Sequence, residues 1–240
     1  DRLAFRFDGI GALPIGRQQI FVVDIGGGEP RALTDGTLGA SGDLAWSADG
    51  QSILFSADRR PDRETLAPDS EIFRVGLVDA LPQALTSREG PDIAPRPSPD
   101  GSLLAYLGYD DQRMGYDNMR LYVANADGSE ARILSGSLDR SVGNPQWSGD
   151  CEAIYVQDED HGETVIALIG LDGHVEPLAR GLGGSDFGRP YAGGAFTVSQ
   201  QGRFAATLTT PQRPAELGIR TCNDGWQVRH RRTGGEERQQ

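Results

Sequence analysis

The sequence contains no lysine, and its 23 positively charged side chains are all arginines. They are outnumbered by 35 acidic side chains. The formal charge of −12 argues against a nucleic-acid partner, which would need a net basic face to bind phosphates. No apolar run approaches the ~20 residues that a membrane-crossing helix requires. We therefore expect neither a nucleic-acid nor a membrane partner.

Cysteine and histidine are also scarce. The two cysteines, Cys151 and Cys222, cannot make a disulfide framework. Reduced thiols in a cytoplasmic protein are the default expectation, and a single disulfide between the two remains open. The three histidines, His161, His174 and His230, have no nucleophile near them in the sequence, so we expect solvated turn and tail residues rather than a general base.

What the sequence does contain is a repeated motif of the form Trp-Ser-x-Asp-Gly-x-x-Ile. Its copies begin at Trp46, Pro97 and Trp147, and a weaker copy begins at Val198. These first positions are separated by 51, 50 and 51 residues. Steps this regular indicate one supersecondary unit of about 50 residues that is used several times.

The centre of the motif is an Asp-Gly pair between two apolar segments. Asp49-Gly50 and Asp100-Gly101 are two of these pairs, and Cys151 replaces the glycine in the third copy. Asp-Gly in this context predicts a two-residue type I′ hairpin turn, with positive φ at both positions.

Each unit contains four strand-like segments. In the first complete unit they are residues 44–46, 53–55, 71–75 and 83–86. No segment shows a sustained apolar period of 3.6 residues, so helix should be scarce. Four short antiparallel strands in every ~50 residues are typical of a β-propeller blade.

We therefore predict an all-β propeller over residues 1–222 that is part of a longer protein, followed by a polar tail at 223–240 outside the domain. Trp46, Pro97 and Trp147 are expected to pack between blades. The partial blade should contain strands at 3–7, 19–24 and 30–34. The predicted blades are a partial one at 3–35 and further ones at 41–86, 92–134, 142–178 and 192–222.

The hairpin and the Arg-x-Leu-Thr strand that closes a unit resemble the propeller repeat shared by TolB and the prolyl oligopeptidase family of serine peptidases. The opening segment 2–36 and the segment Thr209–Leu217 look like the middle propeller and last blade of acylaminoacyl-peptidase and dipeptidyl-aminopeptidase members. The resemblance covers roughly residues 1–218. After Leu217 the chain becomes polar and rich in arginine, where the family would continue an apolar strand.

The resemblance implies a Ser-His-Asp triad on an α/β-hydrolase domain, whose serine lies in a Gly-x-Ser-x-Gly turn. No such turn occurs in this sequence. Ser41 and Ser185 each have a glycine two residues before them, but Asp43 and Phe187 stand two residues after. We expect no catalytic residue in this chain and no peptide cleavage by it alone.

Two charged segments, 58–64 and 110–118, are too long for tight turns between strands. Loops of a propeller gather on its two rims, where binding usually occurs. An arginine there would pair with a peptide carboxylate or carbonyl, although plain solvated loops remain the alternative. The candidate substrate-binding residues are Arg59, Arg60, Arg63 and Arg113.

Other candidate sites are weaker. Asp158-Glu159-Asp160 offers oxygen ligands for Ca²⁺, and 125–130 is slightly like a calcium loop without its spacing. Both fall at predicted turns, so we expect no metal and no cofactor. No predicted helix follows Gly26–Gly28 or Gly181–Gly184, as a phosphate cradle requires, so we interpret both as linkers between blades.

The sequence favours a non-catalytic propeller segment that gates and orients short peptides for a downstream α/β-hydrolase domain. Its partners would be the peptide substrate and that domain. The alternative is a TolB-like propeller that binds a protein partner without any hydrolase. A third interpretation, a metal-dependent propeller hydrolase, would require carboxylates and histidines that converge on the channel.

Overall fold

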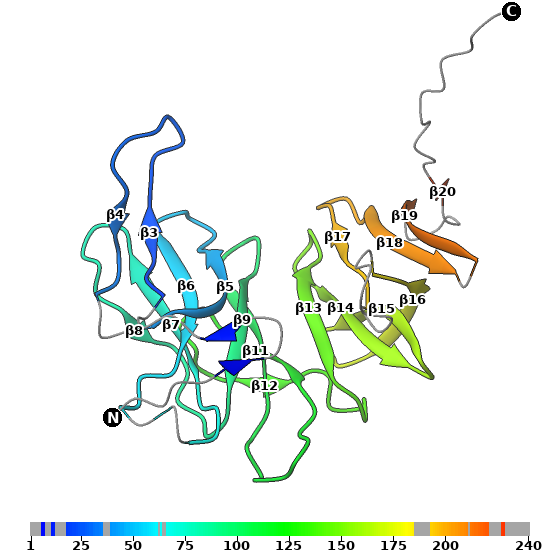
Figure 1. Cartoon of the computed structure of the whole chain (residues 1–240), viewed down its shortest axis with the longest axis horizontal. Helices are drawn as coiled ribbons and strands as arrows, with labels where there is room; N and C mark the ends of the chain where they lie inside the picture. Colours follow the sequence, from blue (N-terminus) through cyan, green and yellow to red (C-terminus); the bar gives the residue numbers. More distant parts are fainter. Residues whose placement is uncertain are drawn as a thin grey trace, which may run out of the picture. The chain divides into compact units, whose positions relative to one another are not determined.

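The computed structural model describes residues 6–7, 11–12, 18–35, 39–61, 63, 66–184, 193–210, 212–220 and 227–228. The elements in these residues are twenty β-strands without an α-helix (Figure 1), which confirms the expected scarcity of helix. The chain forms two compact units, Asp1–Pro145 and Gln146–Gln240.

The first unit contains two complete blades and part of another. The four strands of each complete blade are antiparallel neighbours in chain order, so the blades predicted at 41–86 and 92–134 are confirmed. The strands are β1 (Arg6–Phe7), β2 (Gly11–Ala12), β3 (Phe21–Val22), β4 (Arg31–Ala32), β5 (Ser41–Trp46), β6 (Ser52–Ala57), β7 (Glu71–Gly76), β8 (Gln83–Ala84), β9 (Asp92–Pro97), β10 (Leu103–Gly108), β11 (Arg120–Asn125) and β12 (Arg132–Ile133).

The partial blade differs from the prediction. β3 pairs with β4, as expected for its last two strands. The predicted strand at 3–7 lies within the described residues only at Arg6 and Phe7. These two residues pair with Ala12 and Gly11 in a two-stranded sheet separate from that of β3 and β4. Arg6 and Phe7 are therefore not in one sheet with the other two predicted strands.

The second unit contains the remaining strands, and its boundary falls inside β13. Four antiparallel strands, β13 to β16, correspond to the predicted blade at 142–178, and β17 to β20 correspond to the last one. The two are not separate sheets, because Leu182 of β16 pairs with Leu208 of β18 and joins all eight strands. The strand that closes the last blade, β20, lies within the range predicted as a polar tail. The strands are β13 (Val142–Trp147), β14 (Ala153–Asp160), β15 (Glu163–Gly170), β16 (Val175–Leu182), β17 (Phe196–Val198), β18 (Phe204–Thr210), β19 (Arg213–Arg220) and β20 (Gln227–Val228).

The repeated hairpin turn is not type I′. The amide of Gly50 donates to the carbonyl of Ser47 at 2.9 Å, and φ is positive at Gly50 (+67°) but not at Asp49. The Ser47 hydroxyl instead donates to Asp49 Oδ1 at 2.6 Å. This bond and one from the Gln51 amide lower the pKa of Asp49. The aspartate therefore serves the turn as an acceptor, and only the residue after it needs the left-handed conformation.

Hydroxyl groups fix the fourth strand of three blades to the third strand. Thr34 Oγ1 accepts a hydrogen bond from the Ile20 amide at 2.9 Å, and Thr86 Oγ1 accepts one from the Ile72 amide at 2.9 Å. Ser135 Oγ does the same for the Leu121 amide. The Thr of the repeated Leu-Thr pair is therefore a buried structural residue.

The apolar core of the first unit lies between its blades. One buried cluster joins the partial blade to the next and includes Ile20, Leu33 and Phe55. A second cluster joins the two complete blades and includes Leu54, Leu104, Tyr106 and Tyr122. Cross-strand aromatic pairs repeat in both blades, with ring centroids 5.6 Å apart for Phe55–Phe73 and 5.2 Å for Tyr106–Tyr122. Burial of aliphatic and aromatic strands against neighbouring blades agrees with the predicted architecture.

The three residues that open the repeats do not behave alike. Trp147 is buried, Pro97 is half-buried, and Trp46 is 54% exposed, so the expected burial of Trp46 between blades is wrong. Trp46 pairs with Ile53 and lies on the same face of the sheet. The described strands of the preceding blade, β3 and β4, cover Ile53 but leave Trp46 exposed.

The two glycine-rich segments, both predicted to link blades, lie in different kinds of connection. Gly26, Gly27 and Gly28 lie in the turn between β3 and β4, where the Gly27 amide donates to the Asp24 carbonyl. The expectation of a linker between blades is therefore wrong for this segment. Gly181–Gly184 ends β16 and precedes β17, so this segment does connect two blades.

Candidate functional site

The two predicted rim segments lie at the same end of the first unit. In an antiparallel four-stranded blade, the connection between strands two and three emerges at the same end as the connection to the next blade. The β6–β7, β8–β9 and β10–β11 connections therefore gather on one rim. This arrangement places loops from two successive blades side by side.

A pocket of about 310 Å³ lies among these three connections. We call it the rim pocket. Its wall contains two arginines and three carboxylates, so groups of both signs face the same space. Its lining residues are Arg60, Leu66, Ala67, Asp69, Glu89, Gly90, Asp111 and Arg113.

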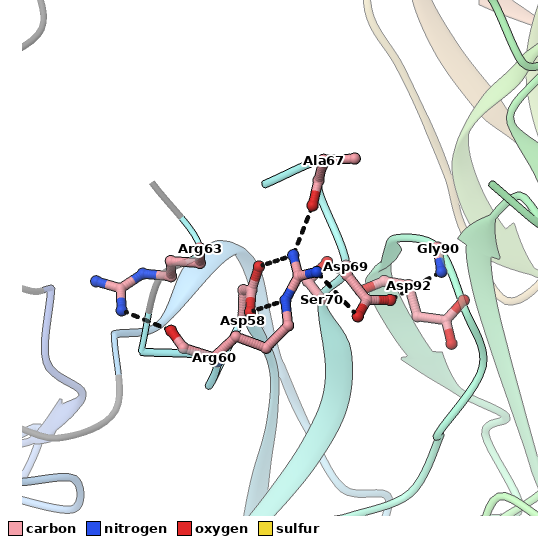
Figure 2. A network of polar contacts seen from close by, with 8 residues as sticks. All are labelled: Asp58, Arg60, Arg63, Ala67, Asp69, Ser70, Gly90 and Asp92. Carbon is pink, nitrogen blue, oxygen red and sulfur yellow. Dashed lines mark hydrogen bonds and ion pairs between the residues drawn. The ribbon is translucent and has the colours of Figure 1, made fainter. Parts of the chain in front are cut away.

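Arg60 is held by the loop that carries it, as Figure 2 shows. Its Nη2 donates to Asp58 Oδ2 at 2.6 Å and to the Ala67 carbonyl at 2.5 Å. Its Nη1 lies 3.3 Å from Asp69 Oδ2. Burial opposes ionisation of Asp58, but hydrogen bonds from the side chain and backbone of Arg60 outweigh it and lower the Asp58 pKa. Arg60 therefore links Asp58, near the start of the β6–β7 connection, to Ala67 and Asp69 near its end.

Of the four predicted arginines, the structure brings Arg60 and Arg113 together at the rim pocket. Arg113 is exposed and forms no ion pair with any residue that the structure describes. Arg63 donates to the Arg60 carbonyl at 3.4 Å, and its guanidinium points away from that of Arg60 (Figure 2). Arg59 lies over the Phe73 ring at 5.3 Å. Arg113 is therefore the predicted arginine with an uncommitted charge at the pocket.

The β8–β9 connection joins the two loops. The Gly90 amide donates to Asp69 Oδ1 at 2.8 Å, and the Asp111 amide donates to the Glu89 carbonyl at 3.2 Å. A side chain at Gly90 would collide with the Tyr109 carbonyl, and φ there is +124°. The pocket wall therefore depends on a glycine that lets two backbones approach.

Beneath the rim lies a charged group that the sequence interpretation missed. The Asp92 side chain is completely buried and forms an ion pair with Arg88, which also bonds Asp110. Glu71 is close by, and Thr86 Oγ1 donates to its Oε2 at 2.5 Å. The signal in the sequence was an aspartate at the start of β9, where the other repeats have Ala40 and Val142.

Burial and neighbouring carboxylates change the ionisation of this group. Burial, together with the charges of Asp92 and Asp69, raises the pKa of Glu71 to about 7. Burial also raises the pKa of Asp92, although the charge of Arg88 opposes the shift. These are the directions expected for carboxyl groups in a poorly solvated, negatively charged environment.

Two further pockets lie in the first unit. One of about 230 Å³ includes Tyr109, Asp117 and Tyr122 beside the same rim. The other, of about 300 Å³, lies at the Ser-x-Asp-Gly turns and includes Asp49 and Asp100. The carboxylates of these turns already accept hydrogen bonds from Ser47 and Ser98. The rim pocket is the one that collects predicted site residues.

The carboxylates Asp158, Glu159 and Asp160 lie in strand β14, and Asp158 is buried. Their predicted place in a turn is therefore wrong.

The histidine candidates lie in connections between strands. His161 is 93% exposed in its side chain and contacts Asp160 Oδ1 at 2.8 Å, and His174 is exposed in the β15–β16 turn. Cys151 is a free thiol, whereas Cys222 and His230 lie outside the described residues. Within the described part of the chain, no group of three or more His, Cys, Asp or Glu is placed to hold a metal ion. No helix in that part is long and apolar enough to cross a membrane.

Comparison with known proteins identifies relatives in sequence. The chain is 27% identical over 163 residues to dipeptidyl-peptidase 5 of Porphyromonas gingivalis, a match that covers 66% of this chain and 24% of that protein. The chain thus matches about a quarter of the length of this relative. No protein-family model matches the chain.

Solved structures share the fold. TolB from Acinetobacter baumannii superposes with a TM-score of 0.64 at 17% identity, over 88% of this chain and 48% of TolB. A puromycin-hydrolysing peptidase of Mycobacterium tuberculosis superposes with a TM-score of 0.63 at 23% identity, over 85% of this chain and 34% of the peptidase. These likenesses confirm the predicted class, a β-propeller built from four-stranded antiparallel blades.

Among β-propeller proteins, the relative in sequence is a peptidase. The chain is similar to the propeller portion of peptidases of the prolyl oligopeptidase family, as the repeat and the flanking segments predicted.

Proposed function

We propose that this propeller gates and orients short peptides for an α/β-hydrolase domain of its parent protein, and that the rim pocket holds one end of the peptide. The observation that carries the proposal is the sequence similarity to dipeptidyl-peptidase 5 over 163 residues. The parent would hydrolyse the peptide by acyl transfer through a Ser-His-Asp triad. Substrate class and partner domain are parts of this proposal.

The rim pocket suits a peptide end in size and in charge. Its volume of about 310 Å³ lies at the small end of ligand pockets, enough for one or two residues. Arg113 supplies a cation without a described ion-pair partner, and such a group forms strong charge-assisted bonds to a carboxylate. Asp69 and Glu89 contribute carboxylate oxygens to the lining of the same pocket.

Binding of tri-alanine to the chain, measured by titration calorimetry, tests the proposal. Free tri-alanine, its N-acetyl form and its C-terminal amide separate recognition of the two ends. If Arg113 binds the carboxylate, Arg113→Gln should weaken binding of the free peptide by about tenfold, the effect of losing one charge-assisted hydrogen bond. The C-terminal amide of tri-alanine should bind the Arg113→Gln variant and the unsubstituted chain equally, because it has no carboxylate for Arg113 to bind.

Arg31→Gln is the matched control, because Arg31 is an exposed arginine on β4. It should bind tri-alanine as the unsubstituted chain does. Equal loss in both variants, or no binding of any of the three peptides, would contradict the proposal. We also expect no turnover of a chromogenic acyl-amino-acid substrate by this chain alone.

The alternative, a TolB-like scaffold for a protein partner, has support from the fold alone, because the TolB likeness is at 17% identity. The sequence relative is a peptidase. We therefore favour the peptide-orienting function.

A further inference from the structure

Asp92 breaks the repeat at a buried position. One backbone hydrogen bond recurs where the chain enters a new blade. The amide at this point donates to a carbonyl that lies just before the third strand of the preceding blade. The bonds are Ala40 to Gln18 at 3.0 Å, Asp92 to Ser70 at 2.6 Å, and Val142 to Met119 at 3.0 Å. The three positions are therefore equivalent, and two carry apolar side chains. At the third, a carboxylate with no exposed surface stands in their place.

Arg88 neutralises this carboxylate and contacts the next blade as well. Nη2 bonds Asp92 Oδ1, and Nη1 bonds Asp110 Oδ1 at 2.7 Å. The guanidinium also lies 4.3 Å from the centroid of the Tyr122 ring. A side chain at Gly108 would collide with Arg88 and with Asp92. The guanidinium therefore fills a space that a glycine leaves for it.

This arrangement is poorly explained by stability alone. Asp92 has no exposed surface, whereas the Arg88 side chain keeps 20% of its surface exposed. Burying a charge is costly, and apolar replacements of buried ion pairs are often neutral or stabilising. Arg88 Nε is buried and has no hydrogen-bond acceptor among the described residues, which adds to the cost. A group that is costly to bury and that departs from its own repeat is a candidate for a functional role.

The pair is directly connected to the rim pocket. Arg88 precedes Glu89 and Gly90, which line the pocket, and Asp110 precedes Asp111, which also lines it. The Asp111 amide bonds the Glu89 carbonyl, and the Arg113 amide bonds Asp111 Oδ1 at 2.7 Å. Arg88 therefore binds the β10–β11 loop at Asp110, one residue before Asp111, whose side chain holds the Arg113 amide.

We propose that Arg88 is a positioning residue: anchored by Asp92, it holds Asp110 and so fixes the β10–β11 loop with Arg113 facing the rim pocket. The loop-fixing role stands on the contacts alone. Its consequence for peptide binding rests on the proposed function of the pocket. Asp110→Asn removes the ion pair between Arg88 and Asp110 and keeps the one between Arg88 and Asp92. The substitution is mild, because the Asp110 side chain is 64% exposed.

Amide hydrogen exchange tests the loop-fixing role. In Asp110→Asn we expect exchange at the Asp111 and Arg113 amides to rise about two- to fivefold, as expected for loss of a partly exposed ion pair. The thermal midpoint should stay unchanged. Asp139→Asn is the control, because Asp139 is a 96% exposed carboxylate of the β12–β13 connection; it should leave both amides as they were. Unchanged exchange in Asp110→Asn would overturn the proposal.

A second variant removes both charges of the Arg88–Asp92 pair and leaves only the exposed Asp110 without its arginine. Arg88→Leu with Asp92→Val restores the valine that Val142 supplies in the next repeat. We expect a thermal midpoint equal to or above that of the unsubstituted chain, together with faster exchange at the same two amides. Arg88→Lys keeps the charge but lacks the fork and should show the loop effect only. A loop that stays protected in the double variant would refute positioning by Arg88.

Tri-alanine binding then separates this inference from the proposed function. Weaker binding in Asp110→Asn, in step with faster exchange, supports both. Faster exchange in a chain that never binds tri-alanine supports the positioning role and contradicts the proposed function of the pocket. Normal exchange with weaker binding contradicts positioning by Arg88.

Discussion

The guanidinium of Arg88 lies 4.3 Å from the centroid of the Tyr122 ring, and that ring stacks on Tyr106 with centroids 5.2 Å apart. A residue of one blade connection therefore rests on an aromatic pair of the next blade. The same guanidinium forms an ion pair with the buried carboxylate of Asp92. The interface between these two blades combines apolar packing with an ion pair.

Tyr122→Leu should lower the free energy of unfolding by about 1–3 kcal/mol, because it removes a stacked aromatic partner and a cation–π contact together. Denaturant unfolding measures the change. Tyr122→Phe keeps the ring and is the matched control, which should stay within about 0.5 kcal/mol. A similar loss in both variants would contradict the assignment of the effect to the ring.

Thr86→Val should cost about 1–3 kcal/mol of unfolding free energy. The hydroxyl accepts from the Ile72 amide at 2.9 Å and donates to Glu71 at 2.5 Å, and its loss leaves a buried amide without a partner. Thr197→Val, at an exposed threonine on β17, should be nearly neutral in the same denaturant measurement. If the two variants are equally stable, the hydroxyl bond does not fix the fourth strand.

Glu71 should make the fold less stable as pH rises. Its folded pKa of about 7 exceeds the ordinary value of 4.5, so between these values the folded state binds a proton that the unfolded state has released. The unfolding free energy should fall from about pH 4.5 to about pH 7 and level off above. Asp92, whose pKa is also raised, acts in the same direction.

Glu71→Gln should flatten this part of the pH profile, measured as the denaturation midpoint at a series of pH values. Glu163→Gln, on the exposed start of β15, should retain the slope of the unsubstituted chain. A pH profile that does not fall across this window, or that Glu71→Gln leaves unchanged, would contradict a raised pKa of Glu71.

Cys151→Gly should stabilise the chain by about 0.5–1 kcal/mol. Cys151 has a φ of +63°, where the equivalent Gly50 and Gly101 have +67° and +75°, and a side chain in this conformation costs more than the backbone freedom that glycine adds. Cys151→Ala keeps the side-chain strain and should be nearly neutral. Thermal melts of the two variants would show whether the backbone or the thiol matters.

The repeat predicted most of the fold, because the steps from Trp46 to Pro97 and Trp147 are regular and each copy carries the same four strands. The turn type was wrong because Asp49 accepts bonds from the turn instead of adopting positive φ. The exposure of Trp46 depends on what the preceding blade covers, which no local pattern contains.

The site was predictable only in part. Loop length and charge selected Arg60 and Arg113, which meet at the rim pocket. The contribution of Gly90 depends on how closely two backbones approach, and this is set by tertiary packing. Asp92 looked like an ordinary polar residue at a strand start, because its burial follows from the partners that Arg88 brings together.

The outermost strands β4, β8 and β12 are each two residues long, and a buried hydroxyl ties each one to its blade. Their free edges therefore present very few unpaired amide and carbonyl groups to another molecule. Short edges of this kind give an incoming chain little to extend, so they protect an all-β protein against edge-to-edge aggregation.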